Sequence, residues 1–232
     1  MLFRFYKENN HTVLEIFGIK LKFYTLKRFN NKILLLKNGT TKRIKSVKGL
    51  KLKFKGSNNT IVFNENIPKF TRSKIFCQDN ATVTFGKNSE FTELIIDAIG
   101  NKNKCFIGDN FSNKKHCFIS FAREKGLTCS IGNNCLFATD IIIRTSDFHT
   151  IRDLKTNEII NFGKDITIGN HVWIAQNVTV LKGVSIADNS VIGACSVVTK
   201  NCDIPNSVYA GSPVRLIKSG IAWEHECPQK QK

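Results

Sequence analysis

The sequence has few acidic residues and no long apolar run. Of its 232 residues, 35 are Lys or Arg and 18 are Asp or Glu, which gives a formal net charge of +17. No window approaches the roughly 18 unbroken apolar residues that a membrane-spanning helix requires. The N-terminal stretch also lacks the pattern of a secretory signal. We therefore expect a protein that is located in the cytoplasm, either free or at the inner face of the membrane.

The sequence also lacks the spacings typical of a disulfide scaffold or a metal site. The eight cysteines are scattered among apolar neighbours, and no two of them form a C-x-x-C pair. Such cysteines are typical of small buried side chains in a reducing compartment. The five histidines include no H-x4-H pair, and a zinc site needs several ligands that converge on one ion. The sequence therefore predicts no metal.

The basic residues are concentrated near the N-terminus. Residues 1–55 hold 15 Lys or Arg against 2 Glu, a net charge of +13, and the other 177 residues contribute +4. A strongly basic section attracts a polyanion or an anionic membrane surface, although a solvated Lys-rich face explains the same composition. Because no helix-turn-helix, aromatic platform or zinc-finger pattern is present, we expect no nucleic acid partner.

Aliphatic residues recur every six positions in the C-terminal third of the chain. A small or β-branched residue follows each of them four positions later. An α-helix, with its 3.6 residues per turn, would carry such positions around its surface, so the period predicts short strands joined by tight turns. The aliphatic positions are Ile168, Ile174, Val180, Ile186, Ile192, Val198 and Ile204.

A second repeat precedes the first at a longer interval. An apolar residue with Asn three positions after it begins four phrases, at spacings of 22, 22 and 24 residues. Asn tolerates a left-handed backbone, so each phrase predicts one corner of a coil. Both intervals fit an all-β solenoid of parallel strands with three faces, in which each coil covers the apolar edge of the next. The phrases begin at Phe63, Phe85, Ile107 and Ile131.

The repeats divide the chain into three parts. We expect the stack to extend from about Lys51 to Val208, within a repeat domain at 51–217. The period is interrupted once, at residues 144–167, which are polar and indicate a projecting loop; long loops in a compact solenoid are usually functional. Residues 1–50 form a basic appendage of unspecified fold, and residues 218–232 form a tail with at most one short helix.

The C-terminal repeats resemble the hexapeptide-repeat acyltransferase superfamily, and within it the O-acetyltransferases of bacterial capsular polysaccharides, including those that act on sialic acid polymers. The resemblance is strongest over residues 130–218, and rests on VWI at 172–174, GVSI at 183–186, SVVTK at 196–200 and AGSPVR at 210–215. It implies a left-handed parallel β-helix. It also implies a homotrimer with acetyl-CoA bound in a groove between neighbouring subunits.

Acetyl transfer from a thioester to a hydroxyl needs a base, donors for the developing oxyanion, and a groove that aligns the reactants. His149 is the candidate base, because imidazole accepts a proton near neutral pH and this residue lies in the loop rather than in the repeat columns. In the resembled family, the catalytic His precedes the Trp of the VWI phrase by about two dozen residues. His149 and Trp173 are 24 residues apart. Trp173 is then expected as a wall of the acceptor or thioester site, with trimer packing as the alternative.

A carboxylate is needed to orient the imidazole of His149. Asp147 is the first candidate, because residues two apart on an extended segment face the same side. Glu158, from the same loop, is the rival. His171 stands where the repeat elsewhere has Asn, so we expect it to form a structural corner.

Further candidates lie near the expected cofactor groove. The backbone N–H groups of Ala175, Gly193 and Ala194 are candidates for the oxyanion and thioester site, because small side chains leave them accessible. Resemblance to family positions near the nucleotide end of acetyl-CoA makes Lys200 and Arg215, with Lys218 beside them, candidates for binding its phosphates.

The sequence thus favours an acetyl-CoA-dependent O-acetyltransferase that acts on a sugar hydroxyl of an acidic capsular or surface polysaccharide. The basic appendage would hold the polyanion near the groove. One alternative is N-acetylation of a nucleotide-linked amino sugar, because acceptor chemistry cannot be inferred from a solenoid. The other is a non-catalytic solenoid that only binds or docks.

Overall fold

The computed structural model describes residues 3–8, 11–16, 19–24 and 29–226. Within these ranges the chain forms β-strands and no helix, as expected for an all-β protein. In the same ranges, no helix is long and apolar enough to cross a membrane.

The chain divides into two compact units, Met1–Asn30 and Asn31–Lys232. In the first unit, three strands pair in antiparallel fashion in the order of the chain. They are β1 (Phe3–Glu8), β2 (His11–Ile16) and β3 (Ile19–Tyr24).

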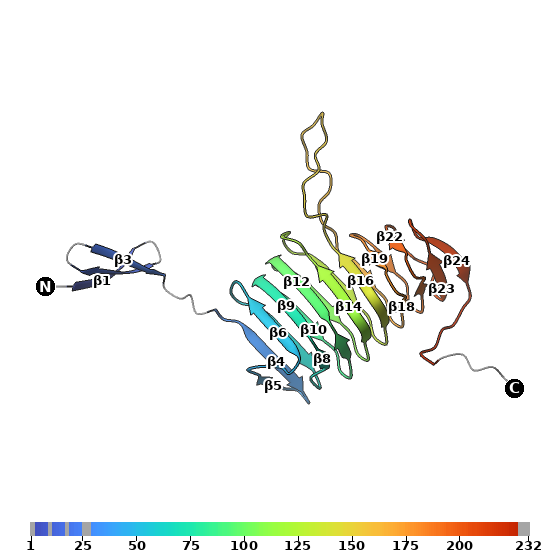
Figure 1. Cartoon of the computed structure of the whole chain (residues 1–232), viewed down its shortest axis with the longest axis horizontal. Coiled ribbons are helices and arrows are strands. Elements are labelled where there is room, and N and C mark those ends of the chain that lie inside the picture. The colour runs from blue at the N-terminus through green and yellow to red at the C-terminus, as the bar shows by residue number, and fades with distance from the viewer. Residues whose placement is uncertain (1–2, 9–10, 17–18, 25–28, 227–232) are drawn as a thin grey trace. The chain divides into compact units, whose positions relative to one another are not determined.

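The second unit is a parallel β-helix whose coils stack in sequence order (Figure 1). We number the three sides of a coil as faces 1, 2 and 3 in chain order. Face 1 is an eight-stranded sheet, closed at its N-terminal end by the antiparallel strand β5. Its strands are β4 (Lys32–Lys37), β5 (Thr40–Arg43), β7 (Thr60–Asn64), β10 (Thr82–Phe85), β13 (Lys104–Ile107), β15 (Thr128–Ile131), β17 (Ile166–Ile168) and β20 (Ser185–Ile186).

Faces 2 and 3 form one thirteen-stranded sheet, because β14 (Ser112–Ser120) and β16 (Leu136–Arg144) run through a corner and pair on both faces. The strands confined to face 2 are β8 (Lys69–Thr71), β11 (Glu90–Thr92), β18 (Trp173–Ile174), β21 (Val191–Ile192) and β23 (Ser207–Ala210), with β24 (Arg215–Ser219) antiparallel at the end. Face 3 adds β6 (Leu50–Phe54), β9 (Ser73–Asp79), β12 (Leu94–Asn101), β19 (Thr179–Val180) and β22 (Val197–Val198).

The stack begins about one coil earlier than the sequence predicted. β4 pairs in parallel with β7, so the coils start at Asn31 and the appendage ends at residue 30 rather than at residue 50. The Asn31 side chain ties this first coil to the next: its amide nitrogen donates to Gly56 O at 3.0 Å, and its oxygen accepts the Asn59 N–H at 3.0 Å. A corner phrase does mark this coil, because Leu35 pairs with Phe63 and Asn38, three positions after Leu35, has a φ of 49°. Leu35 precedes Phe63 by 28 residues. This interval is longer than the 22 to 24 residues between the other phrases, so the sequence prediction missed the coil.

Like side chains stack along the interior, as a solenoid requires. Ring centroids are 5.5 Å apart for Phe63 and Phe85, 5.0 Å for Phe85 and Phe91, and 5.2 Å for Phe91 and Phe111. All four rings are buried. In the C-terminal coils the aliphatic positions of the six-residue period fill the interior, except that Ile204 is 47% exposed. In the last coil the four-residue step from Ile204 leads to Val208, but the buried side chain there is that of Tyr209.

Six of the seven cysteines in the described ranges are buried and none is in a disulfide, which confirms that they act as small core side chains. Burial, with a smaller effect from the Asp97 carboxylate, raises the pKa of the Cys77 thiol to about 12. Cys195 is exposed, and Cys227 lies outside the described residues.

The coil corners have the left-handed backbone that the Asn phrases predicted. The φ angle is 55° at Asn88, 53° at Asn110 and 57° at Asn134. In the first phrase the prediction was wrong by one residue, because Glu65 has the positive φ of 61°. Asn66 still donates its side-chain amide to Asn88 Oδ1 at 2.8 Å, so the amides form a ladder between successive coils.

Truncation of one ring should show how strongly the interior column stabilises the fold. We expect Phe91→Ala to lower the free energy of unfolding by about 3–5 kcal/mol, because it leaves a cavity between coils. Phe106→Ala is the control, since this ring is 38% exposed on the outer surface and its loss should cost at most about 1 kcal/mol. Urea unfolding followed by circular dichroism measures both; equal losses would contradict the packing described above.

Candidate functional site

The loop that carries His149 leaves the stack between β16 and β17 (Figure 1). Its two legs are held together at the base by Glu124, whose carboxylate accepts hydrogen bonds from the Ser146 hydroxyl and, at 2.6 Å, from the Gly163 N–H. The Lys164 N–H also donates to Thr145 O at 2.9 Å. The start of the loop is thereby fixed against the coils.

A pocket of about 500 Å³ lies beside this base. The imidazole of His149 is exposed and lines the pocket, as the role of a base requires. The other lining residues come from the loop, from strand β12 and from the turn that follows β14. They are Asp97, Ile99, Ala122, Arg123 and Phe148.

Phe148, the residue before His149, has a strained backbone. Its φ is 70°, a left-handed conformation that is unusual for a bulky residue away from a coil corner. The Ser146 hydroxyl accepts the Phe148 N–H at 3.2 Å, and Asp147 O accepts the His149 N–H at 2.9 Å. The Arg144 guanidinium lies 5.4 Å from the centre of the Phe148 ring. Strain of this kind is concentrated at functional sites, and here the two hydrogen bonds hold the strained turn that carries His149.

The Asp147 carboxylate is engaged elsewhere than predicted. It is bonded to the Lys182 ammonium and accepts the Asn161 side-chain amide at 3.1 Å, and no described contact joins it to the His149 ring. The hydrogen bond from Lys182 lowers the pKa of Asp147; burial opposes this shift, and the hydrogen bond from Asn161 supports it. Asn161 also donates to His149 O at 2.8 Å. Asp147 therefore holds the loop backbone around His149.

Glu158 does not take the orienting role either. It lies at the far end of the loop, beyond the bridge between Arg152 and Ile159, and its backbone closes the terminal turn by accepting the Asp153 N–H at 2.9 Å.

Asp97 is the carboxylate that the structure brings into the His149 pocket, and the sequence did not indicate it. It is half-buried on face 3. Burial raises its pKa, against the opposing effects of the Ile99 N–H and the Lys55 charge. Asp97 and Arg123 stand 52 and 26 residues before His149, so only the coil register places them together.

Trp173 lies on face 2 and does not line the His149 pocket within one chain. Its side chain is 36% exposed, and its ring centroid is 6.0 Å from that of Trp223. Trp223 stacks on His171 at 4.2 Å and donates its Nε1–H to His171 O at 2.9 Å. His171 has a φ of 52°, which confirms its corner role. The described part of the tail thus packs on face 2 without a helix, whereas residues 227–232 lie outside the described ranges.

Two of the three amides predicted for the oxyanion are already bonded. The Ala175 N–H donates to Ile192 O at 2.9 Å and the Gly193 N–H donates to Tyr209 O at 2.7 Å, both within the coil ladder. Only the Ala194 N–H has no partner among the described residues. The sequence did not predict that the amides of Ala175 and Gly193 are bonded. Small side chains leave a corner accessible to a ligand, but they also allow the backbone of the next coil to approach.

The cations predicted for the phosphates of acetyl-CoA are all exposed near the C-terminal end of the stack. Lys200 follows β22, and Arg215 and Lys218 belong to β24. Within the described ranges, none of the three lies within 4.0 Å of a carboxylate oxygen. Unpaired cations of this kind fit a phosphate-bearing ligand.

Removal of the Lys182 ammonium should release Asp147. We expect Lys182→Gln to raise the pKa of the Asp147 carboxyl toward the ordinary value of an aspartate, as measured by NMR titration. Because the folded-state pKa is below the unfolded value, the ion pair stabilises the fold above the unfolded pKa and ceases to do so as the pH falls through the folded pKa. The stability deficit of the variant should therefore be present at neutral pH and vanish in acid. Lys155→Gln, in the same loop, should change neither quantity, and a shifted Asp147 pKa in this control would refute the assignment.

The chain is similar to known proteins over most of its length. Residues 165–200 match the family described as bacterial transferase hexapeptide (six repeats). The polysialic acid O-acetyltransferase of Neisseria meningitidis is 35% identical over 188 residues, which cover 72% of this chain and 86% of that protein. The galactoside O-acetyltransferase of Escherichia coli strain K12 is 32% identical over 157 residues, 67% of this chain and 73% of that protein. The match to the polysialic acid O-acetyltransferase of E. coli O1:K1, 36% identical, covers 40% of this chain but only 30% of the length of that protein.

Two crystal structures are similar in fold. The polySia specific acetyltransferase NeuO superposes with a TM-score of 0.70 at 28% identity, over 87% of this chain and 88% of that one. The polysialic acid O-acetyltransferase OatWY gives a TM-score of 0.70 at 29% identity, over 87% and 91%. These matches agree with the left-handed parallel β-helix that the sequence resemblance implied. The chain therefore belongs to the hexapeptide-repeat acetyltransferase family that includes the polysialic acid O-acetyltransferases.

Proposed function

We propose that this protein transfers an acetyl group from acetyl-CoA to a sugar hydroxyl of an acidic capsular or surface polysaccharide, with His149 as the general base. The observation that carries the proposal is the pocket that a clamped, strained loop forms around an exposed imidazole. The 35% identity to a polysialic acid O-acetyltransferase, over 86% of its length, supports the acceptor class.

The groups in the pocket are suited to this reaction. The His149 imidazole accepts the proton of the sugar hydroxyl as its oxygen forms a C–O bond to the acetyl carbonyl carbon, and the proton leaves with the thiol when the C–S bond breaks. Arg123, exposed in the same pocket, can hold the carboxylate of an acidic sugar. Acetyl-CoA supplies the activated thioester, and the exposed Lys200, Arg215 and Lys218 suit its phosphates.

A homotrimer with the cofactor groove between subunits is part of this proposal. The loop carries apolar side chains that one chain leaves in water, of which Leu154 is 100% exposed. Exposed apolar clusters of this kind mark protein interfaces. The His149 pocket lies between the loop and β12 of face 3, whereas Trp173 lies on face 2. Trp173 could therefore meet a His149 pocket only across a subunit boundary. The other exposed loop residues are Phe148, Ile151, Ile160 and Phe162. The cytoplasmic location stays a prediction from the sequence.

Replacement of the base tests the mechanism. We expect His149→Ala to reduce acetyl transfer to polysialic acid at least 100-fold, since general bases contribute about 10²–10⁴-fold, while circular dichroism and acetyl-CoA binding stay unchanged. Glu158→Gln, in the same loop, should retain full activity. A second assay with a nucleotide-linked amino sugar separates O-acetylation of the polymer from N-acetylation of a precursor. Wild-type turnover in His149→Ala would exclude the mechanism.

The trimer can be tested through the loop. We expect the native protein to sediment at three times the mass of one chain, and Leu154→Asp to shift it toward smaller species, because a carboxylate would be buried in the interface. Lys155→Gln changes the adjacent, exposed position and should leave the mass unchanged. A native protein that sediments as a monomer would contradict the proposal.

A further inference from the structure

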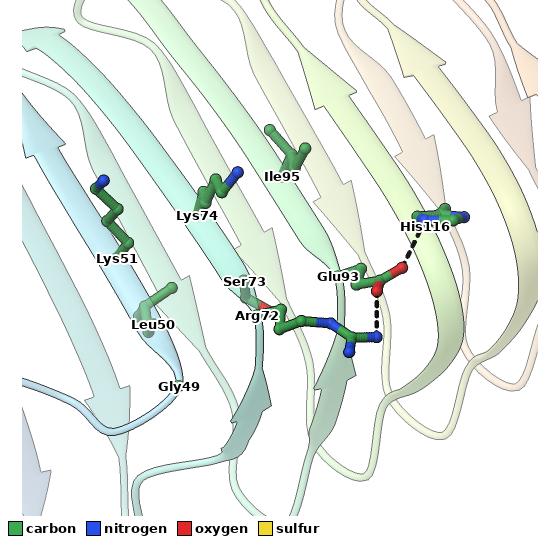
Figure 2. A pocket seen from close by; sticks show the side chains of 9 residues that line it. All are labelled: Gly49, Leu50, Lys51, Arg72, Ser73, Lys74, Glu93, Ile95 and His116. Carbon is green, nitrogen blue, oxygen red and sulfur yellow. Dashed lines mark hydrogen bonds and ion pairs between the residues drawn. The ribbon is translucent and has the colours of Figure 1, made fainter.

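A second pocket, of about 660 Å³, lies on the N-terminal coils, apart from the His149 pocket. Lys51, Lys74 and Ile95 line it from neighbouring strands of face 3, as Figure 2 shows. Along the adjacent corner of the coils, Arg72, Glu93 and His116 form a row that closes one side. No role proposed above uses this pocket.

Glu93, the acidic residue among the described residues that line the pocket, is paired with its neighbours in the corner row. Glu93 is bonded to the Arg72 guanidinium, and its Oε2 lies 2.5 Å from His116 Nε2. His116 Nδ1 is 3.1 Å from Asp140 Oδ1 in the next coil. Only 16% of the Glu93 side chain is exposed. This carboxylate is therefore not free to neutralise the lysines of the pocket.

Lys51 and Lys74 are direct neighbours, and neither has an acidic partner in the part of the chain that the structure describes. The register pairs them on β6 and β9, strands that lie about 4.8 Å apart. Both side chains are exposed, and among the described residues neither ammonium lies within 4.0 Å of a carboxylate. Like charges directly opposite each other destabilise a sheet. An anion bound between the two ammonium groups would remove this repulsion.

The next strand connects this pocket to the His149 pocket. Ile95 of β12 lines the pocket of Lys51 and Lys74. Asp97 and Ile99 of the same strand line the His149 pocket. These residues alternate with inward side chains, so all three point outward. Four residues of strand span about 13 Å. A polymer laid along β12 could therefore occupy both pockets at once, with the apolar Ile95 side chain beneath it.

We propose that the pocket of Lys51 and Lys74 is a docking subsite that binds a carboxylate of the acidic polysaccharide, while a hydroxyl further along the same polymer lies beside His149. The inference rests on the proposed function for the class of acceptor. It predicts that long acidic acceptors gain affinity from this subsite and that acceptors too short to reach it do not.

The test compares the double variant Lys51→Gln/Lys74→Gln with the control Lys87→Gln/Lys104→Gln. The control removes two exposed lysines from the face 1 side of the stack. For polysialic acid, we expect the subsite variant to raise KM about 3- to 10-fold at low salt, as two exposed ion pairs would. Its kcat, its KM for acetyl-CoA and its KM for a sialic acid dimer should not change. High salt should abolish the difference.

Binding of polysialic acid without acetyl-CoA, measured by calorimetry, provides a readout that does not depend on turnover. Affinity should fall by the same factor in the subsite variant only. If the native protein binds polysialic acid but acetylates no acceptor, and the subsite variant loses this binding, the proposed function is rejected and the subsite is retained. An unchanged polymer KM, an equal rise in the control, a rise in the KM for acetyl-CoA, or no binding of polymer to the native protein would each overturn the subsite.

Discussion

The stacking of each coil on its neighbours is the constraint on which the structure depends. A single coil has no core, so its backbone groups and inward side chains must find partners one coil away. The Gly132 N–H donates to Ile168 O at 2.9 Å, and the Thr167 N–H donates to Val184 O at 3.0 Å, each across one turn of the solenoid. Because inward positions form columns, neighbouring coils must match in size, with Phe on Phe in the N-terminal coils and Ile or Val further on.

The same register arranges the outer surface. Residues about 20 positions apart in the sequence become neighbours, so charges fall into columns along faces and corners. At one corner this produces a stabilising alternation, from Arg72 through Glu93 and His116 to Asp140. On face 3 it produces a repulsive pair, Lys51 beside Lys74. A column of like charges without opposite charges beside it lowers the stability of the fold. Binding of an anion would offset the repulsion between the two lysines.

The candidate catalytic groups lie where this regularity stops. The loop between β16 and β17 contributes no rung to the stack, so its conformation is set by side chains instead. Glu124 holds its two legs together, and Lys182 with Asn161 fixes the Asp147 carboxylate. These contacts place an exposed imidazole on a rigid support, and they leave the apolar outer part of the loop exposed to a partner.

The sequence by itself determined the period, and with it the three-faced solenoid, the buried cysteines, the corner positions and the loop that carries His149, because each of these depends on spacing within one or two coils. Only the tertiary structure decided which distant residues share a pocket. It placed Asp97 and Arg123 beside His149, and it paired Asp147 with Lys182. The amides of Ala175 and Gly193 donate to the next coil, and Trp173 lies on face 2. The tertiary structure also added a coil at Asn31. The physical reason is that these facts depend on inter-coil register, which insertions of a few residues shift without any local trace.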